Sequence, residues 1–394
     1  MSAKSEVRWV PVGKVGEVRM GKQLSPASSR ESNSHAPYLR VANVFDGWID
    51  YSDVKSMRFD STDREKYSLK PGDILLNEGQ SLELVGRSAI YRGEVGEYCF
   101  QNTLIRFRGG QCVIPEYAQM VFSRWLNDGT FASIAKKTTS IAHLGGDRFA
   151  KLLFPLIPLS RQRRIVEIVE SLVESERHTE AAAAKIRTLR GAVVDSALSD
   201  LAWSVPLKDA MSEPIRNGFS PVEADSWTGV QMLGLGCLTA EGFRAIHLKN
   251  APASVTVGNK AVLRDGDLLF SRANTRELVG LCGIYRDVGT LCIYPDLMMR
   301  LRPVEGVSSE YLEQVLRSTR FRMGVRAMAQ GTSDSMVKIS SAALGGAMVP
   351  VPDFSVQRRI VDILRAFDSR ILASGQEVCK IRQVRNGLVG SLIQ

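Results

Sequence analysis

The 394-residue chain is long enough for two or three domains with sizeable hydrophobic cores. Its hydrophobic content of 44% is ordinary for a globular protein, and no apolar run approaches the roughly 18 residues of a membrane span. The net charge of +9 is only mildly basic, so a surface for a polyanion would have to come from local clustering of cations.

The N-terminus and the cysteines indicate an intracellular protein. No apolar segment follows residues 1–5, so we expect no secretory signal. The six cysteines form no Cys-x-x-Cys pair and have no zinc-site spacing. We therefore expect reduced thiols in a cytoplasmic protein, with no metal, no other cofactor and no membrane contact.

Residues 1–158 predict a module of mixed α/β structure. Gly-Asp and Glu-Gly turns separate short runs of β-forming residues, at Tyr38–Phe45, Asp73–Asn77, Ser88–Tyr91 and Thr103–Phe107. A helix is expected from about Pro115 to Leu126, followed by a polar loop and a proline-bearing strand. We expect the strands to form a curved mixed sheet.

Residues 159–199 predict one long helix, with Ser160 as its N-cap. From Ser160 to Leu198 this helix would be roughly 58 Å long. Its predicted heptad seam is apolar at both ends and polar in the middle. The seam positions are Ile165, Ile168, Leu172, Ser175, Thr179, Ala182, Ile186, Leu189 and Val193.

The same order of elements recurs in residues 200–353 and 354–394. The helix start Ser-Arg-Gln-Arg-Arg-Ile-Val at residue 160 returns as Ser-Val-Gln-Arg-Arg-Ile-Val at residue 355, an offset of 195. Within the modules, Leu69–Leu76 matches Leu263–Phe270 and Glu83–Gly86 matches Glu277–Gly280, at an offset of 194. Matches of this length in constant register indicate a tandem duplication.

The second copy predicts the same elements as the first. Strands are expected at Asp267–Phe270, Gly283–Tyr285 and Leu297–Leu301, and a helix from about Ser309 to Arg326. Ser355 is the expected N-cap of the second long helix. Its predicted seam is Ile360, Ile363, Phe367, Arg370, Ser374, Glu377, Ile381, Val384 and Leu388.

The two long helices are predicted to pack against each other. Their equal lengths and matched polar centres favour this packing over two ordinary amphipathic helices in separate cores.

Loops rich in Asn, Gln, Ser, Thr, Arg and Lys differ between the copies while the framework repeats. Such side chains read base edges and hold phosphates, although loops are also polar simply because water surrounds them. A stripe of arginines on the second copy's predicted helix, Arg317, Arg320, Arg322 and Arg326, allows the same two interpretations. The candidates for DNA contact are Lys22, Gln23, Asn77, Gln80, Ser81, Arg87, Lys136, Lys137, Thr138, Ser140, Arg216, Asn217, Ser271, Arg272, Asn274, Thr275, Arg276, Gln330, Ser333, Ser335 and Lys338.

Motifs for catalysis are missing from the sequence. Gly16–Gln23 is a near-miss to a phosphate-binding loop, because Gln23 stands where a Mg²⁺-binding Ser or Thr is needed. The second copy has Arg216, Asn217 and Gly218 there instead. Asp73 and Glu83 suggest a nuclease pair only weakly, since Asp73 lies in a Gly-Asp turn that repeats at Asp267. No methyltransferase tetrapeptide or S-adenosylmethionine loop is present, and none of the four histidines recurs between copies, so we expect no enzymatic activity.

This arrangement resembles the specificity subunit of type I restriction–modification systems over essentially the whole chain. The resemblance rests on the module order, the repeated Leu-x-x-Gly-Asp-Ile/Leu-Leu element and the repeated Gln-Arg-Arg-Ile-Val helix start. It implies two target-recognition domains, residues 1–158 and 200–353, that each read half of a split site in double-stranded DNA. It implies that helices 159–199 and 354–394 pack antiparallel, space these domains and dock methyltransferase subunits, two of which are expected.

Cleavage of foreign DNA, a defence against phage, would belong to separate restriction subunits that join through the complex. The sequence departs from a strong helix at Gly375, Gly387 and Gly390, which should weaken the end of the second long helix.

Two similar modules on antiparallel helices would be related by a pseudo-two-fold axis. Such an object fits two DNA half-sites in inverted orientation, about one helical turn apart. Because the loops differ, the full site should be asymmetric. Two alternatives come from other classes: a protein–protein scaffold with duplicated binding modules, and a cryptic nuclease or methyltransferase.

Overall fold

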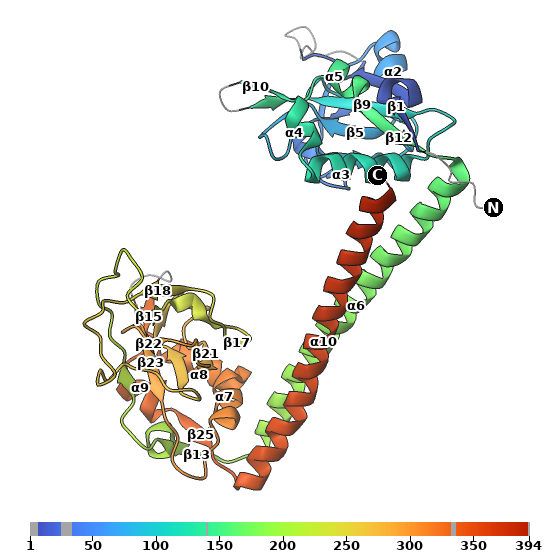
Figure 1. Cartoon of the computed structure of the whole chain (residues 1–394). Coiled ribbons are helices and arrows are strands. Elements are labelled where there is room, and N and C mark those ends of the chain that lie inside the picture. The colour runs from blue at the N-terminus through green and yellow to red at the C-terminus, as the bar shows by residue number, and fades with distance from the viewer. Residues whose placement is uncertain (1–6, 25–33, 139–140, 332–335, 393–394) are drawn as a thin grey trace, which may run out of the picture. The chain divides into compact units, whose positions relative to one another are not determined.

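The computed structural model describes residues 7–24, 34–138, 141–331 and 336–392. The chain divides into two compact units, residues 1–179 with 377–394, and residues 180–376. Each unit holds one globular module and one half of each of two long helices, α6 (Leu159–Ser199) and α10 (Phe354–Leu392) (Figure 1). In the part of the chain that the structure describes, no helix has the length and apolar character needed to cross a bilayer.

An antiparallel four-stranded sheet forms the centre of the first module. Its order is β2 (Gly16–Met20), β9 (Leu104–Gly109), β5 (Ile74–Asn77), β7 (Ser88–Ile90). Helix α3 (Pro115–Asn127) packs on this sheet through a cluster of aromatic rings. Phe107 of β9 meets Phe122 of α3 edge to face, with ring centroids 5.2 Å apart, as aromatic rings prefer.

Smaller elements surround this sheet. In a three-stranded sheet, β3 (His35–Leu39) pairs antiparallel with β4 (Lys55–Arg58) and parallel with β8 (Cys99–Phe100). The remaining strands are β1 (Arg8–Pro11) with β12 (Leu153–Leu156), and β6 (Gly79–Gln80), β11 (Ala142–His143) and β10 (Lys136–Lys137) in one ribbon. Short helices are α1 (Val12–Val15), α2 (Ser61–Tyr67), α4 (Thr130–Ile134) and α5 (Gly146–Lys151).

The second module repeats this topology, which confirms the duplication of a mixed α/β module. Its antiparallel sheet has the order β14 (Arg216–Asn217), β23 (Met298–Leu301), β19 (Leu268–Ser271), β21 (Cys282–Ile284). Again a strand, β15 (Val230–Leu233), pairs antiparallel with one neighbour, β18 (Leu248–Asn250), and parallel with another, β22 (Leu291–Ile293). The other pairs are β13 (Trp203–Pro206) with β25 (Met348–Pro350), β16 (Leu238–Thr239) with β17 (Gly242–Phe243), and β20 (Ala273–Asn274) with β24 (Val337–Lys338).

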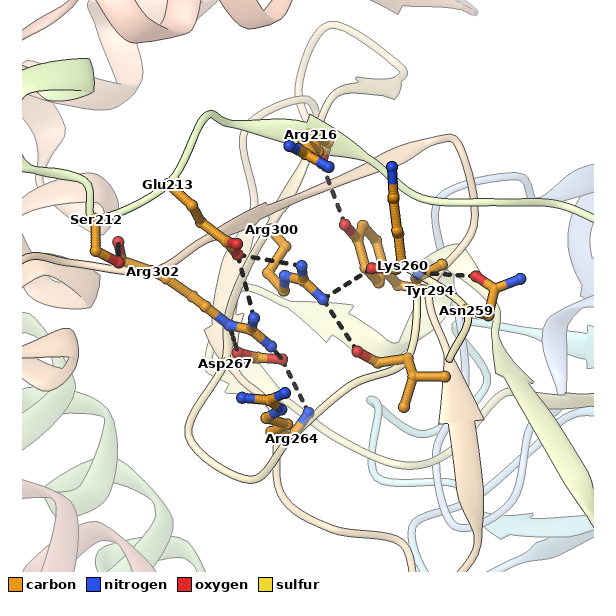
Figure 2. A network of polar contacts seen from close by, with 12 residues as sticks. Ser212, Glu213, Arg216, Asn259, Lys260, Arg264, Asp267, Tyr294, Arg300 and Arg302 are labelled. Atoms are coloured by element: carbon orange, nitrogen blue, oxygen red, sulfur yellow. Dashed lines mark hydrogen bonds and ion pairs between the residues drawn. The ribbon is translucent and has the colours of Figure 1, made fainter. Parts of the chain in front are cut away.

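The repeated Gly-Asp turn anchors a buried network in each module. Asp267 accepts two hydrogen bonds from Arg302, at 2.6 and 2.9 Å, and one from the backbone amide of Arg264 (Figure 2). Arg300, nearly buried, donates to Glu213 and to the carbonyls of Lys260 and Val262.

The first module repeats these bonds with Asp73, Arg108, Arg106 and Glu17, and the carbonyls of Lys66 and Ser68. The hydrogen bond to Asp73 raises the pKa of Arg108, and the matching bond to Asp267 raises that of Arg302. Asp73 is therefore a structural turn residue.

Each unit packs the two long helices antiparallel. In the first unit Glu176 of α6 binds Arg382 and Arg385 of α10 at 2.6 and 2.7 Å, while Val169 and Leu388 share one apolar cluster. In the second unit Arg190 binds Asp368 at 2.6 Å, and Val194 and Leu198 pack with Ile360 and Val361. As residue numbers rise along α6 they fall along α10 in both units.

The predicted heptad seams were half right. Every second predicted seam position is one residue before the position that is actually less exposed. Four of the wrongly predicted residues, Ile168, Leu189, Ile363 and Val384, are 39%, 57%, 44% and 58% exposed. In α6 the less exposed stripe is Ile165, Val169, Leu172, Glu176, Thr179, Ala183, Ile186, Arg190 and Val193. In α10 it is Ile360, Leu364, Phe367, Ile371, Ser374, Val378, Ile381, Arg385 and Leu388.

Three local predictions also need correction. The backbone amides of Gln162 and Gln357 donate to the carbonyls of Pro158 and Asp353, so Ser160 and Ser355 lie inside the first turns and are not N-caps. The predicted helix Ser309–Arg326 is two helices, α7 (Ser309–Arg317) and α8 (Thr319–Met328). Ser318 separates them because its backbone is extended and its hydroxyl caps α8 at Phe321.

Strand β3 ends at Leu39, where a 3₁₀ turn over Val41–Asn43 replaces the expected continuation to Phe45. Helix α9 (Ser341–Gly346) precedes the last strand of the second module. Helix α10 remains helical through Gly375, Gly387 and Gly390 to Leu392.

Candidate nucleic-acid interface

In both modules the central strand leads into a short ribbon that has one buried face. Strand β5 leads into β6, which pairs with β11 and then β10, and β19 leads into β20, which pairs with β24. Gln330 bridges Lys338 in the second module at the place that Lys136 and His143 occupy in the first. The two ribbons therefore have the same backbone frame, and they carry many of the predicted contact residues.

In the first ribbon the exposed candidates are Lys136, Lys137 and Thr138, and Gln80 and Ser81 are half-buried. The Thr138 hydroxyl donates to the carbonyl of Ile141, and the Gln80 side chain accepts from the amide of Ser81. These are local turn contacts that leave the lysines facing solvent.

Asn77 and Ser271 lie in the core at equivalent positions. They are 0% and 1% exposed, and the Asn77 side chain donates to the carbonyl of Val44. Their contact with DNA stays a prediction, and this burial does not support it.

In the second module the exposed candidates on the ribbon are Gln330 and Lys338. Arg272, Asn274, Thr275 and Arg276 are half-buried. The Arg272 side chain makes long contacts of 3.5 Å to the carbonyls of Ile339 and Asp296, whereas the Asn274 side chain caps the amide of Thr275 at 2.8 Å. Candidates Ser140, Ser333 and Ser335 lie outside the described residues.

The edge-strand candidates are not aligned as the sequence suggested. Arg19 pairs with Arg106, and Arg216 pairs with the equivalent Arg300, so Arg216 corresponds to Arg19 and not to Lys22. Gln23, Arg216 and Asn217 are exposed. Lys22 is held by Asp63 at 2.5 Å and by the carbonyl of Arg58, so its ammonium already has an anionic partner.

Arg87 belongs to a three-layer stack beside the first ribbon. Its guanidinium carbon lies 4.7 Å from the ring centroid of Phe45, and Phe45 stacks on Trp48 at 4.5 Å and 11°. Burial lowers the pKa of Arg87, and the nearby charge of Asp46 partly offsets this lowering. The 54% exposed Trp48 gives this stack an aromatic outer face that sequence reasoning missed.

The arginine stripe mostly binds the protein itself. Arg322 and Arg326 donate to the carbonyl of Glu277, and Arg317 donates to that of Ala240. Arg320 lies over the ring of Trp203 at 4.4 Å. These contacts favour a structural role for the stripe over contact with phosphates.

One hydrogen-bonded pair beside the first ribbon was also missed. His143 Nδ1 lies 3.0 Å from a carboxylate oxygen of Glu78, and the two side chains are 44% and 15% exposed. The described residues contain no group of three or more His, Cys, Asp or Glu side chains that could hold a metal ion. The two ribbons therefore carry both cationic side chains, such as Lys136 and Lys338, and an anionic one, Glu78.

Comparison with known proteins shows which family the chain resembles. The type I restriction modification DNA specificity domain matches residues 4–186. The Escherichia coli (strain K12) type I restriction enzyme EcoKI specificity subunit is 24% identical over 357 residues, covering 84% of this chain and 74% of that protein.

Two solved structures share the fold over the whole chain. One is a chain from a type I restriction–modification system, with a TM-score of 0.66, 18% identity and 99% of that chain covered. The other is the HsdS subunit from Thermoanaerobacter tengcongensis, with a TM-score of 0.53, 17% identity and 98% covered. In sequence the chain is therefore similar to type I restriction–modification specificity subunits. Its duplicated modules and paired long helices have the same fold as the two solved chains.

Proposed function

We propose that this chain selects the DNA sequence on which a type I restriction–modification complex acts. Residues 1–158 and 200–353 serve as two target-recognition domains, and each reads one half of a split site in double-stranded DNA. The observation that carries this proposal is the pair of ribbons, which share one backbone frame and differ in their polar side chains. A common frame with different side chains is what reading two different half-sites requires.

The long helices, residues 159–199 and 354–394, space the two domains and dock methyltransferase subunits. Ile168 and Ile363 are equivalent residues that remain exposed, and so are Leu189 and Val384. Exposed apolar side chains at the same places on both helices offer two similar docking faces. This repetition supports the docking of two methyltransferase subunits, with restriction subunits joining through the complex.

In this proposal the chain supplies recognition, and the partner subunits supply methyl transfer and cleavage. The protein works in the cytoplasm, where the DNA is accessible. The two half-sites have inverted orientation, and the full site is asymmetric.

The test is to sequence the methylated bases of host DNA with and without this chain. A bipartite motif should be methylated only when the chain is present. Salt-independent failure to bind DNA would instead favour a protein scaffold. Methyl transfer or cleavage by the purified chain alone would favour a cryptic enzyme.

A further inference from the structure

Glu78 and Arg272 occupy the same place in the two modules. The Glu78 amide donates to the carbonyl of Thr103, and its carbonyl accepts from Leu144. Arg272 makes the same two bonds with Leu297 and Ile339, at 3.0 and 2.9 Å. Both residues lie where the central strand passes into its ribbon, so their backbones are fixed in the same way.

A second pair of equivalent residues, His143 and Lys338, lies on the next strand of each ribbon. His143 pairs with Gly79 across the first ribbon, and Lys338 pairs with the equivalent Ala273 across the second. Their neighbours Ala142 and Val337 are 1% and 0% exposed, which fixes the buried face of each strand. Since side chains alternate along a strand, His143 and Lys338 both belong to the opposite face.

The side chains at these matched places have opposite hydrogen-bonding character. A carboxylate only accepts hydrogen bonds, whereas a guanidinium or an ammonium only donates them. The first module therefore presents an acceptor, Glu78, positioned by the His143 ring at 3.0 Å. The second presents two donors, Arg272 and Lys338, and the 3.5 Å contacts of Arg272 hold it only weakly.

We propose that Glu78 and Arg272 are the residues that decide which base each module reads. This inference rests on the proposed function. Glu78 accepts a hydrogen bond from the N4 amine of a cytosine, which donates in the major groove. Arg272 donates to O6 and N7 of a guanine, the pairing for which a guanidinium fork is suited. His143 is a positioning residue for the carboxylate, and Lys338 stands at the equivalent place on the second ribbon.

The test copies the second module's pair into the first. The full chain carries Glu78→Arg with His143→Lys and is assembled with its methyltransferase subunits, and the methylated motif is sequenced. One cytosine in the first half-site should be replaced by guanine, and the second half-site should stay the same. Glu83→Arg is the matched control, because it reverses an exposed charge five residues away and should leave every base unchanged.

A milder variant covers the case in which the double change fails to assemble. Glu78→Ala removes the acceptor, so binding to the cognate duplex should fall about 5–150-fold, the worth of one base contact. Binding to a duplex altered only at that cytosine should hardly change. An equal fall on all duplexes, or an unchanged motif in an active double variant, would overturn the proposal. If the unsubstituted complex methylates no specific sequence, the proposed function itself fails.

Discussion

Gln162 and Gln357, 195 residues apart, make the same three hydrogen bonds at the start of the two long helices. The Gln162 side chain accepts from the amide of Ile114 and donates to the carbonyls of Cys112 and Ile157. Gln357 accepts from Ser308 and donates to Gly306 and Pro352. Both side chains are 0% exposed. Gln162 therefore links α6 to the loop before α3, and Gln357 links α10 to the loop before α7.

Replacing either glutamine with alanine should loosen one module only. Each change leaves a backbone amide and two carbonyls without their partner, and a buried unsatisfied group costs about 1–3 kcal/mol. Gln162→Ala should therefore lower the free energy of unfolding of its unit by several kcal/mol and speed hydrogen exchange at the amide of Ile114. Arg163→Ala, at an exposed neighbour, is the control. Equal exchange rates in Gln162→Ala and the unsubstituted protein would show that this contact does not fix the helix.

The corrected seam makes a second prediction from adjacent residues. Leu364 is 2% exposed and Ile363 is 44% exposed. Leu364→Ala should cost about 2–5 kcal/mol through lost burial and a cavity, while Ile363→Ala should stay within about 0.5 kcal/mol. Denaturant unfolding of the two variants measures both values. A larger loss of stability in Ile363→Ala than in Leu364→Ala would support the seam predicted from the sequence instead.

The exposed residues next to the seam, Ile168 and Ile363, should matter for assembly rather than for stability. Ile168→Asp and Ile363→Asp should fold normally and bind methyltransferase subunits more weakly, because each puts a charge on a proposed docking face. The number of methyltransferase subunits bound per chain can be measured by light scattering. Full assembly in the double variant would rule out these faces as docking sites.

The sequence predicted the duplication and the long helices because repeated residues are visible without a structure. It predicted the wrong residue at every second seam position, because Ile168 and Val169 are both apolar, as are Ile363 and Leu364. Spacings of three and four fit a heptad equally well, and duplication gave both helices the same ambiguity. Ser318 was read as a helix interior because its capping role depends on its backbone angles.

The candidate interface was only partly accessible to sequence reasoning. Asn77 and Ser271 are polar residues at a strand end, and nothing in their neighbours tells that they point inward. His143 was missed because the histidines were examined only for recurrence between the copies, and its partner Glu78 was missed with it. A signal was present, since Glu78 aligns with Arg272 at the offset of 194 and carries the opposite charge.

Glu313 predicts a dependence of stability on pH. Burial raises the pKa of its carboxyl, although Arg317 and the backbone amide of Ile284 oppose the shift. A carboxyl whose pKa is raised by folding leaves stability intact below its unfolded pKa and lowers stability as pH rises through the folded value. Glu313→Gln should therefore raise the melting temperature at neutral pH and have little effect below about pH 4.

The first module provides a natural control for this change. Gln119 stands at the place equivalent to Glu313, and its amide donates to both the carbonyl and the hydroxyl of Ser88. Gln119→Glu should thus destabilise the first unit at neutral pH and lose this effect in acid. Melting curves for the two opposite variants between pH 4 and 8 measure both effects. Parallel curves for Glu313→Gln and the unsubstituted protein would show that the Glu313 carboxylate carries no such penalty.

The long helices should set the distance between the two half-sites. One heptad inserted after Thr179 and another after Gln376 would fall at the boundary between the two compact units and leave the contacts of each unit intact. Seven residues keep the seam in phase and lengthen each helix by about 10.5 Å. That length is roughly three base pairs of DNA at about 3.4 Å each, and three base pairs rotate a half-site by nearly a third of a turn.

The lengthened protein should therefore either methylate a motif with a longer gap and unchanged half-sites, or lose assembly because the docking faces have moved. Sequencing the methylated motif of both proteins distinguishes these results, and an unchanged gap at full activity would show that the helices do not measure the site.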